Sequence, residues 1–256
     1  MRNNETRRNH PMIRLFNDRI AAGSALAGRL LAYAGRDDVV VLGLPRGGVP
    51  VAWEVARVLG CPLELLLVRK LGVPDRSGPV AGAIAGGGAL NVDPQVVADK
   101  RVSAQQVDQI VASESLDLIR RHALYCGDRQ LVSLEGRTVI VVDDGVVTGE
   151  TMRAALKALR SAKPAWIVVA VPVASDEAVA MIRRVADDVV ALVVPKYLRS
   201  VGEWYRHFTQ VDDEEVAALL SGAGPGARPG PGRADDPTLR SAVTDDRDDP
   251  GERRSR

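Results

Sequence analysis

The chain of 256 residues is poor in aromatic side chains and in cysteine. Aromatic residues make up 4% of it, which argues against the base-stacking surfaces of proteins that bind single-stranded nucleic acids. Two cysteines, Cys61 and Cys126, are too few for a disulfide framework or a cysteine-based zinc site. The three histidines, at positions 10, 122 and 207, do not have the spacing of metal ligands. The composition therefore favours a reduced globular protein without a structural metal.

The chain also lacks an excess of charge of either sign. Its 34 basic and 33 acidic residues nearly cancel, so no basic surface for duplex nucleic acid or anionic membrane is expected. No apolar run approaches the roughly 18 residues of a membrane helix, and no apolar segment of a secretory signal follows the polar N-terminus. We therefore expect a cytoplasmic protein with a small-molecule ligand and with no nucleic-acid or membrane partner.

Residues 13–220 alternate apolar strands with helical segments, whereas residues 1–12 and 221–256 do not. Those ends are polar and rich in charge, and the tail also in glycine and proline, so we predict that they are disordered. The predicted strands span 39–44, 63–68, 138–142, 166–171 and 189–194, and the predicted helices 18–33, 49–59, 103–125, 151–160, 176–185 and 212–220. All-apolar strands with helical connections indicate an α/β fold with a doubly wound, mainly parallel five-stranded sheet.

The most informative motif follows the strand at 138–142. Asp143 and Asp144 come at its carboxyl end, where open α/β sheets bind ligands, and a turn rich in glycine and threonine then begins a helix. Backbone N–H groups, the hydroxyls of Thr148 and Thr151 and the positive end of the helix would favour an anion there. The turn lacks the lysine of a P-loop and the glycine spacing of a dinucleotide fingerprint. It therefore indicates a site for a phosphorylated sugar, while the simpler interpretation is a strand with solvated acids and a helix cap.

A second loop of this kind follows the first strand, with the sequence GLPRGG from Gly43 to Gly48. Its glycines would let the backbone approach an anion, although an ordinary tight turn has the same composition. Arg69 and Lys70 end the second strand, where a basic pair is either a ligand contact or a solvated edge.

The stretch 69–94 breaks the alternation, with many glycines and prolines. It is too long for an ordinary connection, and loops of this length are usually either disordered or functional lids. The embedded segments AGAIA and GALNV are typical of two short strands of a hairpin.

The acid-pair motif resembles the binding motif for 5-phosphoribosyl 1-pyrophosphate (PRPP) of the type I phosphoribosyltransferases, and the GLPRGG loop is similar to their pyrophosphate loop. The segments FNDRIAAGSALA, LLVRKLGVP and VGEWYRHFTQVDDEEV also resemble a branch of predicted bacterial phosphoribosyltransferases without an assigned acceptor. The resemblance covers about residues 16–220 and implies transfer of the phosphoribosyl group from PRPP, with Mg²⁺, to a nitrogen acceptor such as a nucleobase. It further implies a hood at 69–94 that excludes water from the oxocarbenium-like centre.

The resemblance assigns roles to individual residues. Asp143 and Asp144 would hold the ribose hydroxyls and, mostly through PRPP and water, Mg²⁺. With them, Arg46 and Lys70 complete the expected catalytic set, on the pyrophosphate. The remaining PRPP-binding residues would be Gly145, Val146, Val147, Thr148, Gly149, Glu150, Thr151, Gly47, Gly48 and Arg69. Related folds commonly form homodimers, and the sequence leaves open whether this chain does.

Two departures from the pattern leave the activity open. Val147 stands where the 6-oxopurine enzymes have an aspartate that assists proton transfer, so hypoxanthine and guanine are disfavoured and the general base is unidentified. Ser77-Gly78-Pro79 replaces a hood segment in which members of the branch often have a glutamate. The alternatives to an enzyme are a non-catalytic sensor of PRPP or nucleotides and a scaffold with a vestigial site.

The C-terminal region gathers four of the chain's nine aromatic residues, Tyr197, Trp204, Tyr205 and Phe208. Such rings most often pack as a cap on the sheet, and this is the prediction. The alternative is that one of them stacks on the acceptor base.

Overall fold

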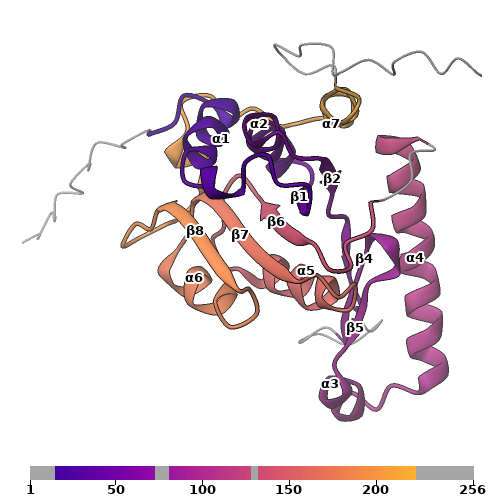
Figure 1. Ribbon diagram of the computed structural model, residues 1–256. Coiled ribbons are helices and arrows are strands. Elements are labelled where there is room, and N and C mark those ends of the chain that lie inside the picture. Colours follow the sequence, from indigo (N-terminus) through magenta and orange to yellow (C-terminus); the bar gives the residue numbers. More distant parts are fainter. Residues whose placement is uncertain (1–14, 73–80, 128–131, 223–256) are drawn as a thin grey trace, which may run out of the picture. The chain divides into compact units, whose positions relative to one another are not determined.

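The computed structural model describes residues 15–72, 81–127 and 132–222 (Figure 1). A parallel five-stranded sheet with the order β2-β1-β6-β7-β8 forms its centre, as predicted. These strands are β1 (Val39–Gly43), β2 (Leu63–Leu65), β6 (Thr138–Val142), β7 (Trp166–Val173) and β8 (Asp188–Val193). The segment 1–12 and all of the predicted tail except Ser221 and Gly222 lie outside the described residues.

Helices cover both faces of this sheet (Figure 1). α1 (Arg19–Ala27) and α2 (Gly48–Leu59) pack on one face, and α5 (Glu150–Arg160) and α6 (Asp176–Ile182) on the other. Alternate side chains of each central strand enter one or the other of these two apolar layers, because successive residues of a strand point to opposite faces. This two-sided burial explains why the strands are mostly apolar and confirms the doubly wound arrangement.

A second sheet of three antiparallel strands contains the expected hairpin. It has the order β3-β4-β5, with β3 (Val68–Lys70), β4 (Gly82–Ala85) and β5 (Leu90–Val92). The prediction of one strand over 63–68 was therefore wrong, because the chain leaves the parallel sheet after β2 and enters the second sheet at β3. Both parts lie against apolar layers, and residues 65–68 are all apolar, so the sequence does not mark the break.

Three further helices lie outside the central layers: α3 (Pro94–Asp99), α4 (Ala104–Cys126) and α7 (Asp213–Leu220). The α4 helix begins with a reciprocal capping box between Ser103 and Gln106 and packs beside the three-stranded sheet (Figure 1). The single helix predicted over 18–33 was wrong beyond α1, since Gly28 caps that helix and a 3₁₀ turn follows at Leu31–Tyr33. Among the described residues, no helix has the length and apolar character needed to cross a membrane.

Candidate functional site

The two carboxylates of the acid pair lie at the carboxyl end of β6. The backbone N–H of Asp144 donates to Oδ1 of Asp143 over 2.9 Å. Burial raises the pKa of Asp143 well above its ordinary value, and the adjacent carboxylate of Asp144 raises it further. Burial also raises the pKa of Asp144, but Arg19 opposes that shift through its charge and its hydrogen bond. The fold thus holds two acids close together in a poorly solvated position, which is costly without a cationic partner.

The glycine loop after β1 packs directly against this acid pair. A Cβ atom added at Gly47 would overlap Oδ2 of Asp144, and one added at Gly48 would lie 2.8 Å from both Cα of Asp143 and the carbonyl oxygen of Val142. The peptide bond between Pro45 and Arg46, just before these glycines, is cis. Only residues without a side chain leave room for this approach, so the structure brings the two motifs found in the sequence into contact.

The turn that follows the acids is fixed to the neighbouring strand. The N–H of Val146 donates to the carbonyl of Val173 over 2.9 Å, and the hydroxyl of Ser175 donates to the carbonyl of Val147 over 2.6 Å. The helix α5 then begins after Gly149, whose φ of +74° favours glycine.

Within this turn, the side chains of Thr148 and Thr151 are exposed at the start of α5, as is Glu150. Gly145 is packed so tightly that an added Cβ would lie 2.6 Å from Val201. The loop is therefore held by its backbone while its hydroxyls remain accessible at a helix N-terminus, which is the arrangement expected of an anion site.

Arg19 is the residue of this site that sequence reasoning missed. Its Nε and Nη2 atoms each lie 2.9 Å from Oδ2 of Asp144, and its Nη1 donates to the carbonyl of Thr209 over 2.7 Å. Its guanidinium carbon lies 3.9 Å from the centroid of the Phe208 ring. The side chains of Arg19 and Asp144 are only 11% and 13% exposed. An arginine in the first turn of a helix is usually solvated, so only its distant partner could have identified it.

The C-terminal segment completes this arrangement. The hydroxyl of Tyr205 donates to the carbonyl oxygen of Asp144 over 2.6 Å, and burial raises the pKa of that hydroxyl. Tyr205 is 1% exposed and stacks beside Phe16, so this ring packs as predicted. Phe208 covers Arg19, whereas Tyr197 is 79% exposed and does not belong to the packed cluster.

The basic residues expected at the pyrophosphate lie in three different directions. Arg46 lies 3.6 Å from the carboxylate of Asp213 in α7, and Lys70 lies 4.0 Å from that of Glu150 at the start of α5. Arg69 instead faces α4 and donates to Glu114 over 2.7 Å. Because Arg69 and Lys70 are adjacent on β3, they point to opposite faces, and the structure brings only Lys70 toward the phosphate turn.

Two other expectations concern the reaction itself. Val147 is half-buried within the turn 145–151, and its side chain has no group that can transfer a proton. Ser77-Gly78-Pro79 lies outside the described residues. No cluster of three or more metal-ligating side chains occurs in the described ranges, and neither Cys61 nor Cys126 is part of a disulfide.

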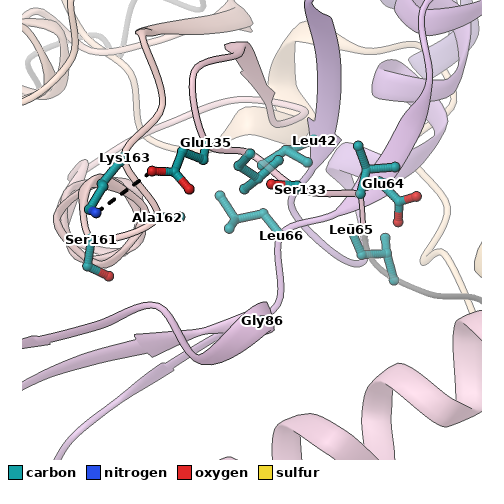
Figure 2. A pocket seen from close by; sticks show the side chains of 12 residues that line it. Leu42, Glu64, Leu65, Leu66, Gly86, Ser133, Glu135, Ser161, Ala162 and Lys163 are labelled. Carbon is teal, nitrogen blue, oxygen red and sulfur yellow. Dashed lines mark ion pairs between the residues drawn. The ribbon is translucent and has the colours of Figure 1, made fainter.

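A separate cavity of about 430 Å³ lies away from these residues (Figure 2). Its apolar wall includes Leu42, Leu65 and Leu66, and an ion pair of 3.7 Å between Lys163 and Glu135 lies at its side. None of the site residues expected from the sequence lines it. This cavity is therefore not the place where the two motifs meet.

Comparison with known proteins agrees with the motifs. Residues 16–202 match the model of the phosphoribosyl transferase domain. The chain belongs to this family. Proteins of two Mycobacterium tuberculosis strains, CDC 1551 and H37Rv, each named provisionally as a phosphoribosyl transferase, are 43% identical over 211 residues. The alignment covers 82% of this chain and 47% of each relative, so the chain spans about half the length of these proteins.

A solved structure supports the fold of this phosphoribosyl transferase domain. The crystal structure of TT1426 from Thermus thermophilus is 44% identical and superposes with a TM-score of 0.71. The match covers 80% of this chain and 97% of that chain. The family predicted from the sequence and its α/β fold are therefore confirmed.

Proposed function

We propose that this phosphoribosyl transferase domain binds PRPP with Mg²⁺ and transfers its phosphoribosyl group to a nitrogen acceptor, most simply a nucleobase. The observation that carries the proposal is the contact of Gly47 and Gly48 with Asp144 and Asp143. It joins a loop suited to an anion with two carboxylates suited to sugar hydroxyls. A third element, the turn 145–151, adds an accessible helix N-terminus in the same region.

In this proposal, the sugar lies over the end of β6. The carboxylate of Asp143 accepts from a ribose hydroxyl, while Asp144 is held by Arg19 and Tyr205 and supports the charge and the geometry of the pair. The backbone N–H groups of the turn and the hydroxyls of Thr148 and Thr151 bind the 5-phosphate.

The pyrophosphate is assigned to Arg46, Gly47, Gly48 and Lys70. We leave Arg69 out of this set because Glu114 and Asp117 in α4 already bind its guanidinium, at 2.7 and 3.2 Å. The half-exposed Arg46 and Lys70 have long, weak ion pairs, of 3.6 and 4.0 Å, which a more highly charged ligand can displace.

The donor set suits Mg²⁺ only as a shared ion. Asp143 has oxygen atoms to offer, but Oδ2 of Asp144 is engaged by Arg19, and the described residues bring no third ligand. Asp143 would therefore hold the ion together with pyrophosphate oxygens and water. When bound, Mg²⁺ would supply neutralisation of the charge on the leaving group.

The reaction is displacement at C1 of the ribose. The bond from C1 to the pyrophosphate oxygen breaks, the acceptor nitrogen bonds to C1 with inversion, and the electron pair leaves with pyrophosphate. The acceptor's proton passes to a base that Val147 cannot provide. Positioning of the reactants and stabilisation of the leaving charge by Arg46 and Lys70 would supply most of the rate.

The test is calorimetric titration of PRPP with and without Mg²⁺ into the wild-type protein and into the Asp143→Asn/Asp144→Asn variant. The control is Asp37→Asn, which changes an exposed aspartate elsewhere. We expect binding that requires Mg²⁺ and is lost only in the double variant. Pyrophosphate release should then be measured with a panel of nucleobases. Binding without release for any base would support the sensor, and no binding by folded wild-type protein would refute the proposal.

A further inference from the structure

A row of side chains crosses the three-stranded sheet on the side opposite Arg69. Lys70 of β3 lies directly opposite Ala83 of β4, and Ala83 directly opposite Asn91 of β5. Residues in direct register project from the same face of a sheet, so Lys70 and Asn91 flank a small central residue. This row is a polar and basic surface with a gap at its middle.

The helix α5 presents a complementary stripe toward this row. Glu150, Arg153, Ala154 and Lys157 are spaced by three and four residues and therefore share one side of the helix. All four line the same cavity as Lys70, Ala83 and Asn91. Ala154 and Ala83 are both small, so the side chains of the helix and of the sheet leave space at the centre of the cavity.

The cavity between these walls has a volume of about 370 Å³. We call it the α5 groove and define it by Lys70, Ala83, Asn91, Arg153 and Lys157. Such a volume is enough for a small phosphorylated molecule.

The charges around the α5 groove are not balanced by the protein alone. Of its two acidic residues, Asp93 caps α3 by accepting from the N–H groups of Gln95 and Val96, and Glu150 lies 4.0 Å from Lys70. Among residues 15–72, 81–127 and 132–222, Arg153 and Lys157 have no carboxylate within 4.0 Å. Two cations one turn apart thus face the cavity without an anionic partner in the described part of the chain.

We propose that the α5 groove is a binding site for the phosphate group of a small phosphorylated ligand. Arg153 can donate two parallel N–H bonds, Lys157 adds a mobile ammonium, and the Asn91 side chain adds an amide donor. A tetrahedral phosphate, with several acceptor oxygens, uses such a set better than a single carboxylate does. The site lies on the side of α5, whereas the proposed 5-phosphate turn lies at its N-terminus. The two sites border each other, because Lys70 is also assigned to the pyrophosphate and Glu150 belongs to the turn. The donors named here, Arg153, Lys157 and Asn91, are not among the residues proposed to bind PRPP, so this inference does not depend on PRPP binding.

The test is a titration of isotopically labelled protein with inorganic phosphate, followed by the backbone amide signals in NMR spectra. Signals of Ala83 and Asn91 report on the α5 groove, and those of Thr148 and Thr151 report on the phosphate turn. The groove variant is Arg153→Gln/Lys157→Gln. The matched control is Arg183→Gln/Arg184→Gln, which removes the same charge from exposed positions after α6. Sodium acetate at equal ionic strength is the second ligand.

We expect saturable shifts at Asn91 with phosphate and none with acetate. The groove variant should weaken this binding about tenfold or more, the loss expected when charge-assisted hydrogen bonds are removed, and the control should retain it. Equal shifts with both salts, or equal binding by the two variants, would overturn the inference. Shifts at Thr148 alone would refute the groove but support phosphate binding at the turn 145–151. Shifts at Asn91 alone would support the groove and argue against phosphate binding at the turn.

Discussion

Replacing Arg19 with methionine tests whether the acid pair is held by a distant cation. The change keeps an unbranched side chain of similar length but removes both contacts of 2.9 Å with Oδ2 of Asp144, the bond to Thr209 and the contact with Phe208. The Asp144 side chain, which is only 13% exposed, then has no cationic partner and still lies beside the acid Asp143.

The expected loss follows from these contacts. Breaking a buried ion pair on one side costs about 3–5 kcal/mol, and a lost charge-assisted hydrogen bond about 1.5–3 kcal/mol. Because Arg19 and Asp144 retain some exposure, we expect a decrease of about 2–4 kcal/mol in the free energy of unfolding. Arg19→Lys keeps the charge but not the planar fork, so it should restore only part of this loss. The affinity for PRPP should fall from the wild-type protein to Arg19→Lys and again to Arg19→Met.

The assay is equilibrium unfolding in urea, with Arg29→Met as the control because Arg29 is exposed just after α1. A double-mutant cycle with Asp144→Asn isolates the pair. Once Arg19 is absent, neutralising Asp144 should cost far less than in the wild-type protein. If Arg19→Met is within about 0.5 kcal/mol of Arg29→Met, or if the two changes are additive, the reasoning is refuted.

Three further changes test the surroundings of the acid pair. Gly47→Ala places a Cβ against Asp144 and should lower the free energy of unfolding by about 1–3 kcal/mol. The control Gly72→Ala, whose added Cβ would have no heavy atom within 4 Å, should be close to neutral. Equal melting temperatures of the two variants would contradict the tight packing at Gly47. Tyr205→Phe removes the hydrogen bond to the carbonyl of Asp144 and should cost about 1 kcal/mol in urea unfolding, and no loss would show that the bond is unimportant. The folded state raises the pKa of Asp143, so as the pH rises this carboxyl loses its proton at a lower pH in the unfolded state than in the folded state. The stability of the wild-type protein should therefore fall as the pH rises above about 4. Asp143→Asn should therefore be more stable than the wild-type protein at pH 8, and this gain should vanish near pH 4. If the melting temperatures of the two proteins change with pH in parallel, this reasoning is refuted.

Most of the central sheet, and the two motifs at its edge, could be predicted from the amino-acid pattern. Strands 39–44 and 138–142 were predicted within one residue because both faces of the sheet are buried, which leaves these strands mostly apolar and without charged residues. The place of Asp143 and Asp144 at the end of β6 followed from the same pattern, since the carboxyl ends of parallel strands meet at one edge.

Local patterns failed where the deciding contact is distant in the chain. The strand predicted over 63–68 divides between two sheets because backbone pairing, not hydrophobicity, chooses the partner. The adjacent Arg69 and Lys70 have different partners because the pleat directs one to α4 and the other toward α5.

Tertiary structure alone decided how the acid pair is supported. Arg19 and Tyr205 lie 125 and 61 residues from Asp144 in the sequence, and backbone hydrogen bonds between residues 16–17 and 204–207 bring their two segments together beside it. Apolar periodicity carries no information about a hydrogen-bonding partner at such a separation, because that partner is selected by the packing of whole elements. The sequence thus specified which groups lie at the edge of the sheet, and the fold specified which of them are bound by distant groups of the protein itself.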